Sequence, residues 1–226
     1  MLKVNRFFLN FIANSNLLQL LASKFILYIP LSISHNFAKY NIIKKIIYTI
    51  SIDEIEGDYA EFGCFTGSSL KHAHRCIKKF SVDKNIFGFD SFQGFPKELH
   101  KEFKSENFKV DYKKIIKLEN KYPKIKIFKG FFSTSLNKKN VLEKVKNISF
   151  SFIDCDLAVS AKDVFEFIVK RQTNGSFIMI DDFYNLDRES NSIREEFFKY
   201  FKLNEDVFLF SNFGIGGVCF RYFKKN

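Results

Sequence analysis

Apolar residues along this chain follow two spacings, which predict two kinds of element. Helical spacing predicts helices over residues 16–29, ended by Pro30, and over residues 37–52, where five isoleucines form one stripe. Short apolar runs predict buried strands near residues 58–62, 85–89, 124–129, 148–153 and 175–180. Further helices are predicted over residues 68–80, 97–121, 138–145, 161–171 and 192–201, and a hairpin over residues 207–213 and 217–223.

The order of these elements predicts an α/β fold. Strands that alternate with helices form a parallel sheet, and the last two strands add an antiparallel hairpin. We therefore expect a Rossmann-like, mostly parallel seven-stranded sheet over residues 57–226. Residues 1–56 are expected to form an N-terminal helical extension, which would serve as a lid or a dimer surface. Ser68 or Ser69 and Ser160 are the predicted caps of two of the helices.

Composition adds few constraints. The chain has 226 residues, of which 46% are hydrophobic, enough for one substantial core. Its 36 Lys and Arg against 25 Asp and Glu give a net charge of +11. The basic residues are scattered, which favours a solvated basic surface over nucleic-acid binding. Four cysteines without a CxxC pair and four scattered histidines indicate a reduced, cytoplasmic protein without a zinc site.

The N-terminal residues superficially resemble a signal peptide, since Lys3 and Arg6 precede an apolar stretch. Asparagines interrupt that stretch, and Lys24 and Pro30 break the run that follows. The run is also short for a membrane span. We therefore predict a packed helix and no transmembrane segment, with weak contact with a membrane surface as the alternative.

Carboxylates follow two of the predicted strands. Asp154 and Asp156 end one run, and Asp181 and Asp182 end the next. Because ligands bind outside the carboxyl ends of parallel strands, these acids are expected to line a shared cleft. Converging carboxylates bind protons or a cation, and all-oxygen ligation suits Mg²⁺ or another hard divalent ion. The alternative is that the acids only cap the helices that follow.

A glycine-containing turn follows the first strand, in the stretch from Glu61 to Ser69. Its spacing is Gly-x-x-x-Gly, from Gly63 to Gly67, which is not the dinucleotide fingerprint. The next strand ends in Asp90, where an acid grips ribose hydroxyls in α/β nucleotide folds. Strand, glycine turn, helix, strand and acid together favour an adenosine-containing cofactor.

Several motifs resemble the macrocin O-methyltransferase family, whose members methylate sugar hydroxyls with S-adenosylmethionine. They are Glu61-Phe62-Gly63, Asp90-Ser91-Phe92-Gln93-Gly94-Phe95-Pro96, Gly130-Phe131-Phe132, Asp154-Cys155-Asp156-Leu157 and Asp181-Asp182. The match covers roughly residues 58–184. One departure is that Ala158 and Val159 stand where the family usually has a Tyr.

The resemblance implies roles for individual residues. The cofactor-binding residues implied for S-adenosylmethionine are Glu61, Gly63, Gly67, Ser68, Asp90, Ser91 and Phe92. The implied metal ligands are Asp154, Asp181 and Asp182, and Asp156 is the implied general base. A metal that chelates two neighbouring hydroxyls would lower their pKa, so that Asp156 can accept the proton.

The expected activity is therefore metal-assisted methylation of a sugar hydroxyl on a deoxysugar or a surface-polysaccharide precursor. Methylation of another diol such as a catechol, or an inactive S-adenosylmethionine-binding partner subunit, are the alternatives. A homo-oligomer remains open, and no nucleic-acid partner is expected. The sequence names neither the sugar nor the hydroxyl.

Overall fold

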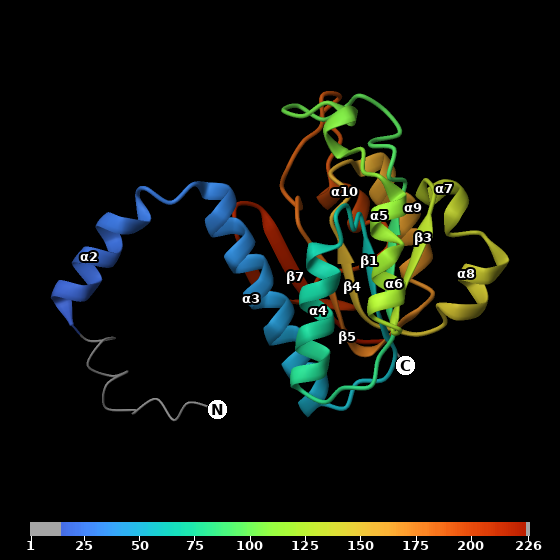
Figure 1. Cartoon of the computed structure of the whole chain (residues 1–226), viewed down its shortest axis with the longest axis horizontal. Helices are drawn as coiled ribbons and strands as arrows, with labels where there is room; N and C mark the ends of the chain where they lie inside the picture. The colour runs from blue at the N-terminus through green and yellow to red at the C-terminus, as the bar shows by residue number, and fades with distance from the viewer. Residues whose placement is uncertain (1–14, 225–226) are drawn as a thin grey trace.

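The computed structural model describes residues 15–224, which form a sheet between two layers of helices (Figure 1). The described strands form one seven-stranded sheet in the order β3-β2-β1-β4-β5-β7-β6. Pairs among β1 to β5 are parallel, and β7 is antiparallel to both β5 and β6. The strands are β1 (Asp58–Phe62), β2 (Ile86–Asp90), β3 (Ile125–Lys129), β4 (Ile148–Ile153), β5 (Gln172–Ile180), β6 (Val207–Phe213) and β7 (Gly217–Tyr222). This confirms the predicted fold class.

Each face of the sheet has its own apolar cluster. One face packs against α3 (Leu31–Ile52) and α4 (Ser68–Lys79), with α5 (Tyr112–Ile115) and α6 (Lys117–Lys121) beside them. The other face packs against α7 (Phe132–Ser135), α8 (Lys139–Lys144), α9 (Ala158–Ile168) and α10 (Ile193–Phe197). Strands β1 and β4 are buried along nearly their whole length, because helices cover both of their faces.

The two N-terminal helices differ in how they pack. In α3 the isoleucine stripe is buried as predicted, although the helix begins earlier, at Leu31. By contrast α2 (Asn16–Ile26) has no buried residue, and Figure 1 shows it projecting away from the sheet. The prediction of a packed helix is therefore wrong for α2. Within residues 15–224 no single helix is long and apolar enough to cross a membrane, and the pair α2 and α3 passes that test only together, with a bend of 118° between them.

The structure also corrects the helix predicted over residues 97–121. A loop occupies residues 91–104, followed by a 3₁₀ turn η1 (Ser105–Phe108) and then the short helices α5 and α6. Phe95, Phe103 and Phe108 pack together with His100 over the carboxyl edge of the sheet. Positions 103 and 108 do not share a helix face, so a continuous helix could not place both rings in one cluster.

The predicted serine caps are wrong. Helix α4 is preceded by Gly67, which has a left-handed backbone and no capping side chain. Helix α9 begins at Ala158 after Leu157, so Ser160 lies inside its first turn. The reason at α4 is that the Ser69 hydroxyl donates instead to the Glu61 carboxylate.

Candidate active site

Strand register places the candidate residues in one row. Phe62 of β1 is level with Phe89 of β2 and with Ile153 of β4, and Ile153 is level with Ile180 of β5. The next residue along each strand therefore gives the row Asp90, Gly63, Asp154 and Asp181. Adjacent strands lie about 4.8 Å apart, so Asp154 is beside Asp181 and two strands away from Asp90. The order and register of the strands therefore place Asp90 at one end of the candidate site and Asp154 at the other.

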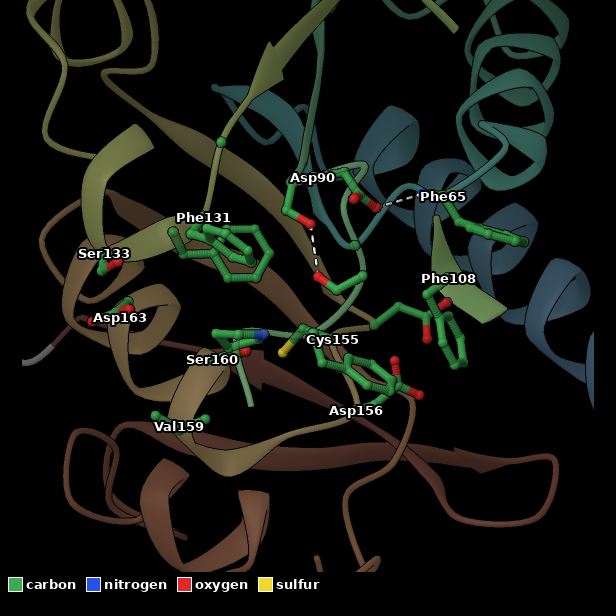
Figure 2. Close-up of a pocket in the computed structure, with 18 of the residues that line it drawn as sticks. Phe65, Asp90, Phe108, Phe131, Ser133, Cys155, Asp156, Val159, Ser160 and Asp163 are labelled. Carbon is green, nitrogen blue, oxygen red and sulfur yellow. Dashed lines mark hydrogen bonds between the residues drawn. The ribbon is translucent and has the colours of Figure 1, made fainter. Parts of the chain in front are cut away.

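A cavity of about 350 Å³ lies over this row. Its lining combines acids and aromatic rings, and it includes Lys39, Gly63, Phe65, Asp90, Ser91, Phe95, Phe108, Phe131, Phe132, Ser133, Asp154, Asp156, Ser160 and Asp163. Figure 2 shows Phe131, Ser133 and Asp163 at one end and Phe65 and Phe108 at the other, with Asp90 between them. A volume of this size is within the range of small-molecule sites.

The glycine turn allows the ends of β1 and β4 to approach closely. Gly63 has φ +95°, and a Cβ there would lie 1.7 Å from the carbonyl oxygen of Asp154. Any other residue would force these two strand ends apart. Gly67 has φ +70° and starts α4 beside Leu118, where a Cβ would also collide. Gly63 lines the cavity, but Gly67 and the exposed Ser68 do not.

Glu61 lies beneath the turn and is fully buried. The Tyr59 hydroxyl donates to one carboxylate oxygen at 2.6 Å, and the Ser69 hydroxyl donates to the other. Burial raises the pKa of Glu61 to about 7, although these two hydrogen bonds and Lys39 lower it in part. Glu61 is not part of the cavity lining, so in this structure it acts on the cavity through its charge and through the turn that it supports.

Asp90 holds the two loops that flank the centre of the cavity. The backbone N–H of Phe65 donates to one of its carboxylate oxygens at 2.8 Å (Figure 2). The backbone N–H of Phe92 donates to the other oxygen at 2.6 Å. Ser91 closes the next turn by donating to the Gly94 carbonyl at 2.8 Å. The Phe92 ring is buried against Tyr112, so this residue offers only its backbone to the site.

The four acids after β4 and β5 converge, as predicted. Carboxylate oxygens of Asp154, Asp181 and Asp182 all lie within 4.8 Å of one another. Asp156 lies beside them on the cavity wall, with a left-handed φ of 61°. None of the four caps a helix, since α9 begins after Leu157 and α10 after Ser192. The alternative that these acids are only helix caps is therefore wrong.

Two side chains of α3 contact the acids, and neither was assigned a role from the sequence. The Lys39 ammonium lies 3.0 Å from Oδ2 of Asp154 and 2.8 Å from Oδ2 of Asp181. His35 Nδ1 accepts from the backbone N–H of Ile215 at 3.1 Å, so its proton is on Nε2. Nε2 then donates to both oxygens of Asp181 at 3.1 Å.

The charges of this cluster are unevenly distributed. Burial and the neighbouring carboxylates raise the pKa of Asp154 and of Asp156 well above the usual range, and that of Asp182 to about 6. Burial would raise the pKa of Asp181 too, but His35 and Lys39 outweigh it and lower this pKa. Without another cation, the cluster therefore keeps protons on some of its acids.

His100 approaches the acids from the loop after β2. Its Nδ1 accepts from the backbone N–H groups of Glu102 at 3.1 Å and of Phe103 at 2.9 Å, which leaves the proton on Nε2. Nε2 lies 4.0 Å from Oδ1 of Asp156, a gap that one hydroxyl oxygen would bridge. The ring stacks on Phe95 at 5.5 Å between centroids. Burial lowers the pKa of His100, which favours a neutral donor.

Sequence reasoning missed these three residues. One signal was present for two of them, because His35 and Lys39 are spaced by four and continue the buried isoleucine stripe of α3 towards its N-terminus. Polar residues in line with a buried stripe point into the protein. The sequence carries no comparable signal for His100.

Comparisons with known proteins identify the family and the fold of this chain. The sequence model of the macrocin O-methyltransferase family matches residues 37–221, most of the chain. The chain belongs to this family. The matched range includes Lys39 and every acid of the site, but it begins after His35. Membership makes the protein an O-methyltransferase of a family that uses S-adenosylmethionine to methylate sugars.

Several solved structures have a similar fold. The O-methyltransferase NovP has a TM-score of 0.68 and 16% identity, and the match covers 83% of this chain and 80% of NovP. The structure of the calicheamicin methyltransferase CalS11 has a TM-score of 0.69 and 17% identity, and the match covers 94% of this chain and 88% of CalS11. An O-methyltransferase from Bacillus cereus, in complex with SAH, has a TM-score of 0.54 and 15% identity over 81% of each chain. At these identities the similarity shows the fold. A search of curated protein sequences gave no match.

Proposed function

We propose that this macrocin-family O-methyltransferase uses a divalent metal to methylate a sugar hydroxyl, on a deoxysugar or a surface-polysaccharide precursor. The observation that carries this proposal is the convergence of Asp154, Asp181 and Asp182 beside a cavity that Asp90 also lines. Of these three converging acids only Asp154 is in the cavity lining, and Asp181 and Asp182 lie behind it. One end then holds the methyl donor, and the other holds the acceptor. CalS11 is described as a TDP-rhamnose 3′-O-methyltransferase, which supports an activated deoxysugar as the acceptor class.

S-adenosylmethionine suits the first end. Asp90 would accept hydrogen bonds from the ribose, and the turn at Gly63 would lie against the methionine portion. The ring of Phe131 and the carboxylate of Asp163 lie at the far end, where an adenine would stack and donate its amino group. The cofactor carries a sulfonium and an ammonium, and the acidic lining attracts both charges.

A hard divalent cation suits the second end. Its oxygen ligands would each lie about 2.1 Å from Mg²⁺, hence at most about 4.2 Å apart. The carboxylate oxygens of Asp154, Asp181 and Asp182 come within 4.8 Å of one another, so small side-chain movements are enough. A bound cation would orient two vicinal hydroxyls and lower their pKa. It would also release the protons that these crowded acids hold.

Asp156 is the proposed general base. It faces the cavity next to the proposed ligands, so its carboxylate can reach a hydroxyl held there. His100, which lies 4.0 Å from Oδ1 of Asp156, would donate to the same hydroxyl or to its neighbour. Methyl transfer itself is a displacement at carbon, so positioning and deprotonation are what these residues contribute.

A catechol or another aromatic diol is the second candidate for the acceptor. The observation in its favour is the aromatic cluster of Phe95, Phe103 and Phe108, which packs around His100 beside Asp156. Flat rings favour a planar acceptor, but they also stack on the apolar face of a sugar. An inactive binding subunit is the third candidate, and the complete set of acids speaks against it.

The N-terminal extension over residues 1–56 is proposed to act as a lid through α3 and as a partner surface through α2. Helix α3 supplies His35 and Lys39 to the acids, whereas α2 exposes apolar side chains such as Leu17 and Phe25. A second copy of the chain or a membrane surface would cover such side chains. The cytoplasmic location stays a prediction.

One experiment tests the proposed function and separates its candidates. Calorimetry with S-adenosylhomocysteine measures cofactor binding first. Release of S-adenosylhomocysteine is then followed with S-adenosylmethionine and either dTDP-rhamnose or 3,4-dihydroxybenzoate, each in Mg²⁺ or in excess chelator. We expect turnover of the sugar nucleotide in Mg²⁺ only. Full activity in chelator would contradict the metal role, and turnover of the catechol alone would favour the second candidate.

A further inference from the structure

The Lys39 ammonium lies where a cation is expected. It contacts Oδ2 of Asp154 at 3.0 Å and Oδ2 of Asp181 at 2.8 Å, and its side chain is only 11% exposed. Its stem passes over the ring of Phe152, with Nζ 5.6 Å from the ring centroid. Among the described residues, no other lysine or arginine is recorded within ion-pairing distance of these two acids.

A metal and this ammonium cannot use the same two oxygens together. A divalent ion that ligates both Oδ2 atoms would lie about 2.1 Å from each. The ammonium lies in the same space between them, where two cations would overlap and repel. Rotation of Asp181 away from the ammonium is restricted, because His35 donates to both of its carboxylate oxygens at 3.1 Å.

Lys39 also lies at a boundary of α3. Towards the C-terminus the helix is anchored, since Ile43 and Ile46 are fully buried. Towards the N-terminus its apolar side chains are exposed, since Leu31 and Phe37 are each 71% exposed, and His35 holds this end through polar contacts. The Lys39 side chain itself lines the cavity, so it has space to move away from the acids without unfolding the helix.

We propose that Lys39 competes with the divalent cation for Asp154 and Asp181. The Lys39 ammonium pairs with these two carboxylates until the cation displaces it. This rests on the metal site of the proposed function. The paired form protects the acids from repulsion in the absence of metal, and it lowers the apparent affinity for metal. If about 90% of the molecules are in the paired form, the apparent affinity falls about tenfold. Metal binding would then free the Lys39 side chain.

The test measures Mn²⁺ binding to the full chain by electron paramagnetic resonance. Lys39→Met should bind Mn²⁺ about tenfold more tightly than the wild type, and Lys39→Gln, which keeps a polar side chain, should show the same gain. The matched control is Lys44→Met, an exposed lysine of the same helix, which should bind like the wild type. Asp182→Asn should bind more weakly.

A second measurement uses the wild type alone, so it does not depend on a variant that folds. Reductive methylation followed by mass spectrometry should find Lys39 protected without metal and several-fold more reactive with Mn²⁺. Mn²⁺ binding by the wild type without a gain in Lys39→Met and Lys39→Gln would overturn the competition, as would a Lys39 that stays protected. Absence of Mn²⁺ binding in every variant would instead overturn the metal site itself.

Discussion

The acids at the ends of β1 and β2 and the acids at the ends of β4 and β5 are held by different kinds of partner. Glu61 and Asp90 receive hydrogen bonds from residues at most 25 positions away in the chain. Asp154 and Asp181 receive theirs from α3, which lies 115 and 146 positions away. The first pair belongs to the proposed cofactor end, and the second to the proposed acceptor end.

One edge of the sheet therefore forms both the proposed cofactor end and the proposed acceptor end. At the cofactor end, the local turn supplies the donors, so the acids are satisfied as soon as β1, α4 and β2 come together. At the acceptor end, the sheet gathers more negative charge than its own loops neutralise. A distant helix must supply the balance, and a divalent cation would do the same. The acceptor end is therefore the adjustable part of the site.

The largest expected effect is a loss of turnover caused by a change at the acceptor end. Asp156→Asn should lower turnover by roughly 10²–10⁴-fold, because a positioned base is lost. Affinity for S-adenosylhomocysteine should stay unchanged, and additional Mg²⁺ should not restore the rate. The measurement is a titration of activity against Mg²⁺, with Asp182→Asn beside it as the variant that high Mg²⁺ partly rescues. Rescue of Asp156→Asn by metal would make Asp156 a ligand.

The next largest expected effect is a loss of cofactor affinity caused by a change at the cofactor end. Glu61→Gln should weaken S-adenosylhomocysteine binding by about 1.5–3 kcal/mol, since a charged acceptor is lost and one of the Tyr59 and Ser69 hydroxyls faces an amide N–H₂. Calorimetry measures the affinity, and Mn²⁺ binding serves as the control that should not change. Unaltered affinity would show that Glu61 has only a structural role.

A pH titration of cofactor binding tests the charge of Glu61. The pKa of Glu61 is raised by burial to about 7, so the carboxyl is neutral at lower pH and cannot balance the ammonium of the ligand. Affinity for S-adenosylhomocysteine should therefore rise about tenfold between pH 6 and pH 8. The free energy of unfolding of the ligand-free protein should change in the opposite direction. It should fall as pH rises from 4.5 to about 7, because the buried Glu61 carboxyl must ionise. Glu61→Gln should flatten the affinity profile.

The smallest effect concerns the link between α3 and the acids. His35→Ala removes the acceptor of the Ile215 N–H and the donor to Asp181, which should lower the free energy of unfolding by about 1–2 kcal/mol. Thermal unfolding measures it. The control is Asn36→Ala, whose side chain bonds only the Ser32 carbonyl of its own helix. An equal loss in both variants would show that α3 is stabilised without the contact to Asp181.

Much of the fold could be predicted because its signals are local. Buried strands appear as apolar runs, and an acid that follows such a run lies at the carboxyl edge of a parallel sheet. That reasoning placed Asp90, Asp154 and Asp181 on one edge, and strand register then set them in one row. The prediction failed between residues 97 and 121, because the packing of Phe103 and Phe108 in an aromatic cluster overrides local helix propensity.

The strands, the glycine turn and the acids at the sheet edge follow from local sequence, since each depends on neighbours in the chain. What neutralises those acids depends on tertiary packing. Lys39 is one of 36 lysines and arginines, and its position in line with the isoleucine stripe indicates burial but does not identify Asp154 and Asp181 as its partners. Contacts over more than 100 positions depend on how whole elements dock. The direction of one side chain after docking then decides whether a basic residue is solvated or buried against a carboxylate.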